Sequence, residues 1–180
     1  MAKTESFILS GFGGQGLLFA GKVIAYAGLH DGREVSWLPS YGPEMRGGTA
    51  NCTVVLSDEP IGSPMVGRPD LLMALNLPSF DRFERLVVPG GVAVVDSSLV
   101  ERRSERTDIT VCYIPATRLA NEAGLRGGAN MIALGKLLRE TGFVSMETLL
   151  EGLKKSMPQR KEHLYPYNVR AIELGYEYKE

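Results

Sequence analysis

The residues best suited to bind a ligand form a glycine-rich segment, Ser10-Gly11-Phe12-Gly13-Gly14-Gln15-Gly16. An apolar stretch precedes it at 6–9, and apolar residues spaced three and four apart follow it at 17–27, as in a strand followed by an amphipathic helix. Glycines let the backbone approach a ligand closely, and a helix N-terminus offers unpaired, partly positive N–H groups. Such a turn suits a phosphate, a carboxylate or a neighbouring segment. The candidate binding residues are Gly11, Gly13, Gly14, Gln15 and Gly16.

Three of these glycines, Gly11, Gly13 and Gly16, match the G-x-G-x-x-G fingerprint of dinucleotide-binding folds. The fingerprint also needs an acidic residue near the end of the second strand, whereas Asp31 and Glu34 lie before or at its beginning. Nicotinamide binding is therefore disfavoured, and a P-loop is excluded because no Gly-Lys-Ser/Thr closes the segment. A turn that only packs the strand against the helix remains an alternative.

A second candidate region is the loop Ser40-Tyr41-Gly42-Pro43-Glu44-Met45-Arg46-Gly47-Gly48. Arg46 carries planar donors that suit a carboxylate or a phosphate, and the two glycines after it can form an anion-binding nest. We expect this loop beside the glycine turn, at the carboxyl edge of the sheet, where ligands of open α/β sheets bind. A solvated charge at Arg46 and a packing role for Tyr41 are the alternatives. The candidates here are Ser40, Tyr41, Arg46, Gly47 and Gly48.

Asparagine and aspartate side chains follow two further predicted strands. Asn76 and Asp96 each end such a strand, so they either line the same crevice or cap the helix or turn that follows. Because Asn76 would line the crevice under the first alternative, it is included among the candidate binding residues. Asn130 opens a predicted helix, and we interpret it as a cap.

Groups that could carry out catalysis are scarce. His30 and His163 lie apart in the sequence, without a nucleophile or a metal ligand beside them, and no paired carboxylates occur at a useful spacing. Cys52 and Cys112 are far apart, outside any CxxC motif, and are expected to be reduced and buried. The sequence predicts a chain that binds rather than catalyses on its own, with no catalytic or metal-binding residue.

Composition limits the protein class. The chain has 180 residues, of which 44% are hydrophobic, which is enough for one core and indicates a single domain over residues 1–180. Its net charge is −1, and its 20 basic and 21 acidic residues are mixed, which argues against nucleic acid as a partner. No run approaches the ~20 apolar residues of a membrane span, and no signal peptide is evident. We therefore expect a cytoplasmic protein with no membrane partner.

The hydrophobic pattern predicts alternating strands and helices. Strands are expected at residues 6–9, 34–38, 49–56, 70–75, 92–95 and 110–114, and helices at 17–27, 78–85, 117–123, 129–141, 145–157 and 165–176. Several strands are apolar on both faces, which predicts an α/β three-layer sandwich with a mostly parallel sheet. The strand at 49–56 follows the previous strand with no helix between them, so the sheet is expected to be mixed, with a helical C-terminal third.

These motifs resemble the gamma subunit, or fused gamma domain, of 2-oxoacid:ferredoxin oxidoreductases. The glycine segment 11–16 and the loop 40–50 carry the resemblance. Further matching features follow in the family's order, namely Asn76-Leu77-Pro78, Pro89-Gly90-Gly91, Pro115-Ala116-Thr117 and Ala129-Asn130-Met131. The continuous form of residues 40–48 is closest to the 2-oxoglutarate and branched-chain 2-oxoacid members.

The resemblance implies a division of labour. The assembled enzyme would decarboxylate a 2-oxoacid oxidatively on thiamine diphosphate, pass electrons through iron–sulfur clusters to ferredoxin, and release an acyl-CoA. Thiamine diphosphate, Mg²⁺ and the clusters would belong to alpha, beta and delta-type (ferredoxin-like) subunits, with none of them bound by this chain alone. The gamma part would help to form the region where coenzyme A enters, or its loops would dock the partner subunits.

A subunit of a complex is also expected to expose an apolar patch when isolated. Four C-terminal tyrosines are candidates for such a patch, with packing inside the chain as the alternative. They are Tyr165, Tyr167, Tyr176 and Tyr178.

Overall fold

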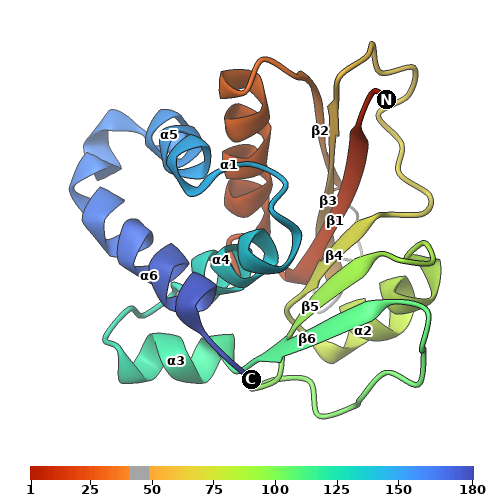
Figure 1. Cartoon of the computed structure of the whole chain (residues 1–180). Coiled ribbons are helices and arrows are strands. Elements are labelled where there is room, and N and C mark those ends of the chain that lie inside the picture. Colours follow the sequence, from red (N-terminus) through yellow and green to blue (C-terminus); the bar gives the residue numbers. More distant parts are fainter. Residues whose placement is uncertain (41–48) are drawn as a thin grey trace.

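The computed structural model describes residues 1–40 and 49–180. Within them, six strands form one sheet in the order β2-β3-β1-β4-β5-β6 (Figure 1). The strands are β1 (Thr4–Phe12), β2 (Glu34–Ser40), β3 (Thr49–Ser57), β4 (Leu71–Ala74), β5 (Val92–Asp96) and β6 (Thr110–Ile114). Strands β1, β4, β5 and β6 pair in parallel, while β3 is antiparallel to both of its neighbours, β1 and β2. The prediction of a mostly parallel but mixed sheet is confirmed.

Helices cover the sheet unequally, as Figure 1 shows. They are α1 (Leu17–His30), α2 (Leu77–Phe83), η2 (Glu84–Leu86), α3 (Ala116–Glu122), α4 (Ala129–Thr141), α5 (Met146–Ser156), η3 (Gln159–Leu164) and α6 (Tyr165–Glu177). The larger core joins one face of the sheet to α1 and to the C-terminal helices α3 to α6, whereas α2 packs on the other face. This arrangement confirms the α/β architecture and the helical C-terminal third. None of the described helices is long and apolar enough to cross a bilayer.

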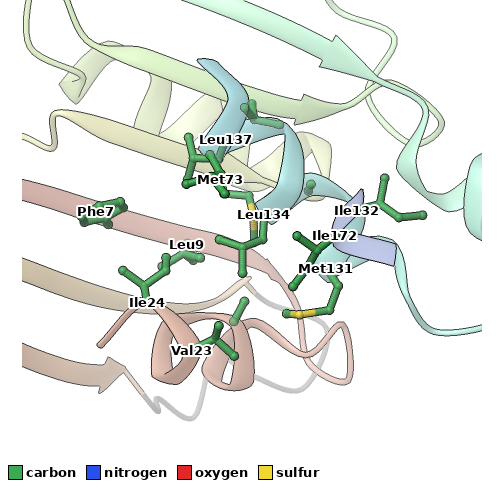
Figure 2. Close-up of a cluster of buried hydrophobic side chains, with 14 of the residues drawn as sticks. Phe7, Leu9, Val23, Ile24, Met73, Met131, Ile132, Leu134, Leu137 and Ile172 are labelled. Atoms are coloured by element: carbon green, nitrogen blue, oxygen red, sulfur yellow. The ribbon is translucent and has the colours of Figure 1, made fainter. Parts of the chain in front are cut away.

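The alternation of side chains along β1 explains the two cores. Phe7 and Leu9 point to the larger one, where Figure 2 shows them with Ile24 of α1 and Leu134 of α4, whereas Ile8 points to the smaller one. All five side chains are almost fully buried, and burying each apolar chain of this size contributes about 1.5–3 kcal/mol. A one-residue slip of β1 would exchange its two faces, so burial fixes the register that positions the glycine turn.

Two strands, β1 and β2, continue two or more residues beyond their predicted carboxyl ends. Strand β1 continues through Gly11 to Phe12, because β3 pairs with it along its whole length, from Thr4 opposite Ser57 to Phe12 opposite Thr49. Strand β2 continues through Pro39 to Ser40, although it was expected to end at residue 38. An edge strand hydrogen-bonds on one side only and therefore tolerates a residue without an N–H group.

Candidate functional site

The glycine turn lies at the carboxyl end of β1, at the N-terminus of α1. Its reversal uses residues 13–16: the Gln15 N–H group donates to the Phe12 carbonyl over 3.3 Å, and Gly14 and Gly16 have φ of 89° and 75°. A side chain at either of these two positions would strain the backbone. Gly13 has no such constraint, and a Cβ atom there would meet no described atom within 4 Å. The described residues therefore leave the space beside Gly13 open.

Gln15 braces the turn against the next strand of the sheet. Its Oε1 atom accepts a hydrogen bond from the Phe12 N–H group at 2.6 Å, and its Nε2 atom donates to the Leu75 carbonyl at 3.2 Å. A Cβ atom at Gly11 would collide with the same amide. This glycine thus makes room for the brace, which holds the turn at the junction of β1 and β4.

Asn130 provides a second brace, from a helix far away in the sequence. Its Nδ2 atom donates to the Gly16 carbonyl at 3.0 Å, while its Oδ1 atom accepts from the Met131 N–H group at 2.9 Å. The interpretation of Asn130 as a cap of its helix was wrong, because Gly128 is the N-cap of α4. No local pattern identifies a contact between residues 114 positions apart, so sequence reasoning missed this one.

The Asn130→Ala substitution is expected to lower the free energy of unfolding by ~1–3 kcal/mol, since it removes a hydrogen bond to the Gly16 carbonyl and leaves the buried Met131 N–H group without its partner. Urea denaturation followed by far-UV circular dichroism measures this change. Asn121 is exposed on α3, where its side chain makes no hydrogen bond with a described residue, so Asn121→Ala is the matched control. Equal unfolding midpoints for the two variants would show that the brace contributes nothing.

Helix α1 begins with donors that the described chain leaves free. Its first backbone hydrogen bond runs from Ala20 to the Gly16 carbonyl, so the N–H groups of Leu17, Leu18 and Phe19 have no described acceptor. The N-cap glycine offers no side-chain acceptor, and the first turn contains no acidic residue. Free N–H groups at the positive end of a 14-residue helix favour an anion there.

Ser40 and Asn76 lie on the same edge of the sheet as the turn. Ser40 ends β2 and pairs with Asn51, which in turn pairs with Ser10, so two strand spacings, or about 10 Å, separate Ser40 from β1. Asn76 follows β4 and caps α2, its Oδ1 atom accepting from the Ser79 N–H group at 2.9 Å. Its buried Nδ2 atom has no described partner. A ligand-binding role for Ser40 and Asn76 stays a prediction.

Tyr41, Arg46, Gly47 and Gly48 lie outside the described residues. The attachment points of their segment are described: Ser40 ends β2, and Thr49, which begins β3, pairs with Phe12 beside the glycine turn. Both ends of the segment therefore lie at the edge where the turn is found. The roles assigned to its residues stay predictions.

Asp96 acts as a further structural brace. Asp96 accepts hydrogen bonds from the Ser98 N–H group and from both the N–H and hydroxyl groups of Thr117, so it fixes the turn after β5 and the start of α3.

Burial raises the pKa of the Cys52 thiol to about 12 and that of the Cys112 thiol to about 11. Both thiols stay protonated at neutral pH and are poor nucleophiles. Among the described residues, no cluster of His, Cys, Asp and Glu could hold a metal ion.

The family model for pyruvate ferredoxin/flavodoxin oxidoreductase matches residues 6–178. The chain belongs to this family. The 2-oxoglutarate synthase subunit KorC of Methanocaldococcus jannaschii is 41% identical over 172 residues, covering 94% of this chain and 90% of that protein. The resemblance to gamma subunits of 2-oxoacid:ferredoxin oxidoreductases is thereby confirmed, and members of this family are subunits of oxidoreductases.

Two solved structures of this oxidoreductase family share the fold. The gamma subunit of a keto/oxoacid ferredoxin oxidoreductase from Geobacter sulfurreducens is 32% identical, with a TM-score of 0.82 and 96% of each chain covered. The 2-oxoglutarate:ferredoxin oxidoreductase of Magnetococcus marinus, solved with 2-oxoglutarate, coenzyme A and succinyl-CoA bound, is 26% identical with a TM-score of 0.84. There, 96% of this chain matches 30% of a longer chain, as expected for a fused gamma domain.

Proposed function

We propose that this chain is the gamma subunit of a complex that oxidatively decarboxylates a 2-oxoacid to its acyl-CoA and transfers the electrons to ferredoxin. The alpha, beta and delta-type subunits would hold thiamine diphosphate, Mg²⁺ and the iron–sulfur clusters, and the isolated chain would be inactive. The similarity to a 2-oxoglutarate synthase subunit favours 2-oxoglutarate as the substrate. The task of this chain would be to form part of the coenzyme A site and to support assembly.

The observation that carries the proposal is a glycine turn that the described residues leave open, in front of helix N–H groups that have no described acceptor. Coenzyme A is anionic through its phosphates, and the free N–H groups of Leu17, Leu18 and Phe19 suit such a ligand. Exposed Gly13 and Gly14 allow a bulky ligand to approach the backbone. In this role the chain binds and orients coenzyme A, while the redox chemistry belongs to groups on other subunits.

Co-expression of the tagged chain with its chromosomal neighbours tests the proposal. We expect brown, cluster-containing subunits to co-purify, and the complex to reduce a dye only when a 2-oxoacid and coenzyme A are both present. A panel of 2-oxoacids, compared by kcat/KM, identifies the substrate. A colourless, partner-free chain that binds NAD tightly would contradict the proposal and favour a stand-alone dinucleotide-binding protein.

A further inference from the structure

An apolar hollow of about 350 Å³ opens beside the first turns of α1. Leu18 and Phe19 of α1 line it, together with Trp37 of β2, Met157, which lies just before η3, and Leu164, which ends η3. Trp37 and Leu164 keep 38% and 36% of their surface exposed. Large apolar side chains gathered around a hollow, rather than scattered singly, mark a binding surface.

A second hollow, of about 230 Å³, continues the first along η3. Met157 belongs to both, and Tyr165 lines the second. The surface therefore offers two adjacent sites for large apolar side chains, separated by one methionine. We call this pair of hollows the Trp37 groove. The expected tyrosine patch is not its main feature, since Tyr165, Tyr167, Tyr176 and Tyr178 are half-buried against the larger core.

Lysines outnumber carboxylates around the Trp37 groove, where Glu162 is the one acidic residue in the described lining. Lys22 and Lys161 line the first hollow and Lys154 lines the second, and residues 154–163 hold four cations against one carboxylate, Glu162. None of the three lining lysines has a carboxylate within 4.0 Å in the described part of the chain. A chain with a net charge of −1 thus concentrates unpaired positive charge at the rim of an apolar groove.

We propose that the Trp37 groove docks an acidic segment of a partner polypeptide, which places two large apolar side chains in the hollows and its carboxylates beside the lysines. An apolar centre containing Trp and Met within a charged rim is the usual anatomy of a protein–protein interface. The two hollows share Met157, and such adjacent hollows suit two large apolar side chains of one polypeptide segment. The partner is identified as another subunit of the same enzyme, so this inference rests on the proposed function.

Footprinting and cross-linking of the purified complex test the proposal. Trp37 is the only tryptophan of the chain, so its oxidation by hydroxyl radicals, read by mass spectrometry, reports directly on the groove. We expect Trp37 and Met157 to be oxidised in the isolated chain and protected in the complex. A carbodiimide, which joins carboxylates to lysines without a spacer, should link Lys22 or Lys161 to an acidic, apolar segment of a partner subunit.

Two variants test the charge and the hollow separately. Lys161→Glu and Leu164→Glu change exposed side chains, so the fold should tolerate them, and each is expected to weaken retention of that partner about tenfold. The Lys161→Glu effect should shrink as salt is added. Arg85 is exposed on η2, on the other side of the sheet, without an ion pair to a described residue, and Arg85→Glu is the matched control.

The outcomes separate this proposal from the proposed function. A complex that forms and is active while Trp37 stays fully reactive overturns the groove proposal and leaves the function standing. Protection of Trp37 by coenzyme A alone would also overturn the groove proposal, because coenzyme A would then be the occupant. Cross-links that join two copies of this chain would overturn it as well, because the occupant would then be a second copy. If no complex forms at all, both proposals fail.

Discussion

Replacing Gly135 with leucine is expected to lower the free energy of unfolding by about 3 kcal/mol, because it would force two packed helices apart. Helices α4 and α6 cross at Gly135 and Gly175, where their backbones touch. A Cβ atom at Gly135 would overlap the Ile172 carbonyl oxygen, and one at Gly175 would overlap the Ile132 carbonyl oxygen. A backbone, unlike the end of a flexible side chain, cannot move aside locally.

The loss of packing should extend beyond the point where α4 and α6 cross. Ile172 is fully buried in the larger core beside Met131 and Leu134 (Figure 2), so separating α6 from α4 would open the centre of that core. Urea denaturation should show a lower midpoint for Gly135→Leu. The matched control is Gly62→Leu, because a Cβ atom at Gly62 meets no described atom within 4 Å. Equal midpoints for the two variants would refute this account of the helix crossing.

The sequence predicted the elements well wherever local chemistry determines them. The helix at 129–141 and the strand at 110–114 have the predicted bounds. Ser145, where a helix was predicted to begin, caps α5 by accepting a hydrogen bond from the Thr148 N–H group. Periodicity and capping act within a few residues and can be read from one sequence. Strand ends such as Phe12 and Ser40 depend on pairing with β3, which no local pattern records.

The same limit explains what was and was not predicted about the site. The spacing of its glycines located the turn between β1 and α1. The residues that hold the turn, Gln15 through Leu75 and Asn130 through Gly16, act across the fold. Glycine lowers helix propensity at Gly135 and Gly175, yet these two glycines allow the backbones of α4 and α6 to touch. Local propensity therefore identifies glycines without indicating which of them serve packing and which serve binding.

At Gly13, a role in binding can be tested without disturbing the packing. The Gly13→Asp substitution is expected to raise the KM for coenzyme A at least about tenfold in the assembled complex. The turn tolerates a side chain here, since φ is not positive and a Cβ atom meets no described atom within 4 Å. The new carboxylate would face the ligand that the free donors of α1 attract. Repulsion between like charges several ångströms apart near a protein surface is worth ~1–2 kcal/mol, or about tenfold in affinity.

Two controls isolate the charge at Gly13. Gly13→Asn adds a side chain of the same size without the charge, and Gly62→Asp adds the same charge at another open position; both should leave the KM for coenzyme A within about threefold of wild type. The KM for the 2-oxoacid should not change in any variant. Because the effect is electrostatic, raising the ionic strength should reduce the difference between Gly13→Asp and Gly13→Asn.

The same variants decide whether the turn binds coenzyme A or docks a partner subunit. A turn that docks a partner would lose subunits from the complex when Gly13 becomes aspartate, and the complex that remains would keep its KM for coenzyme A. A turn that binds coenzyme A would keep its subunits and change that KM alone. Gly13→Asp and Gly13→Asn with equal KM values and intact complexes would contradict both roles, and would leave the free N–H groups of α1 to water.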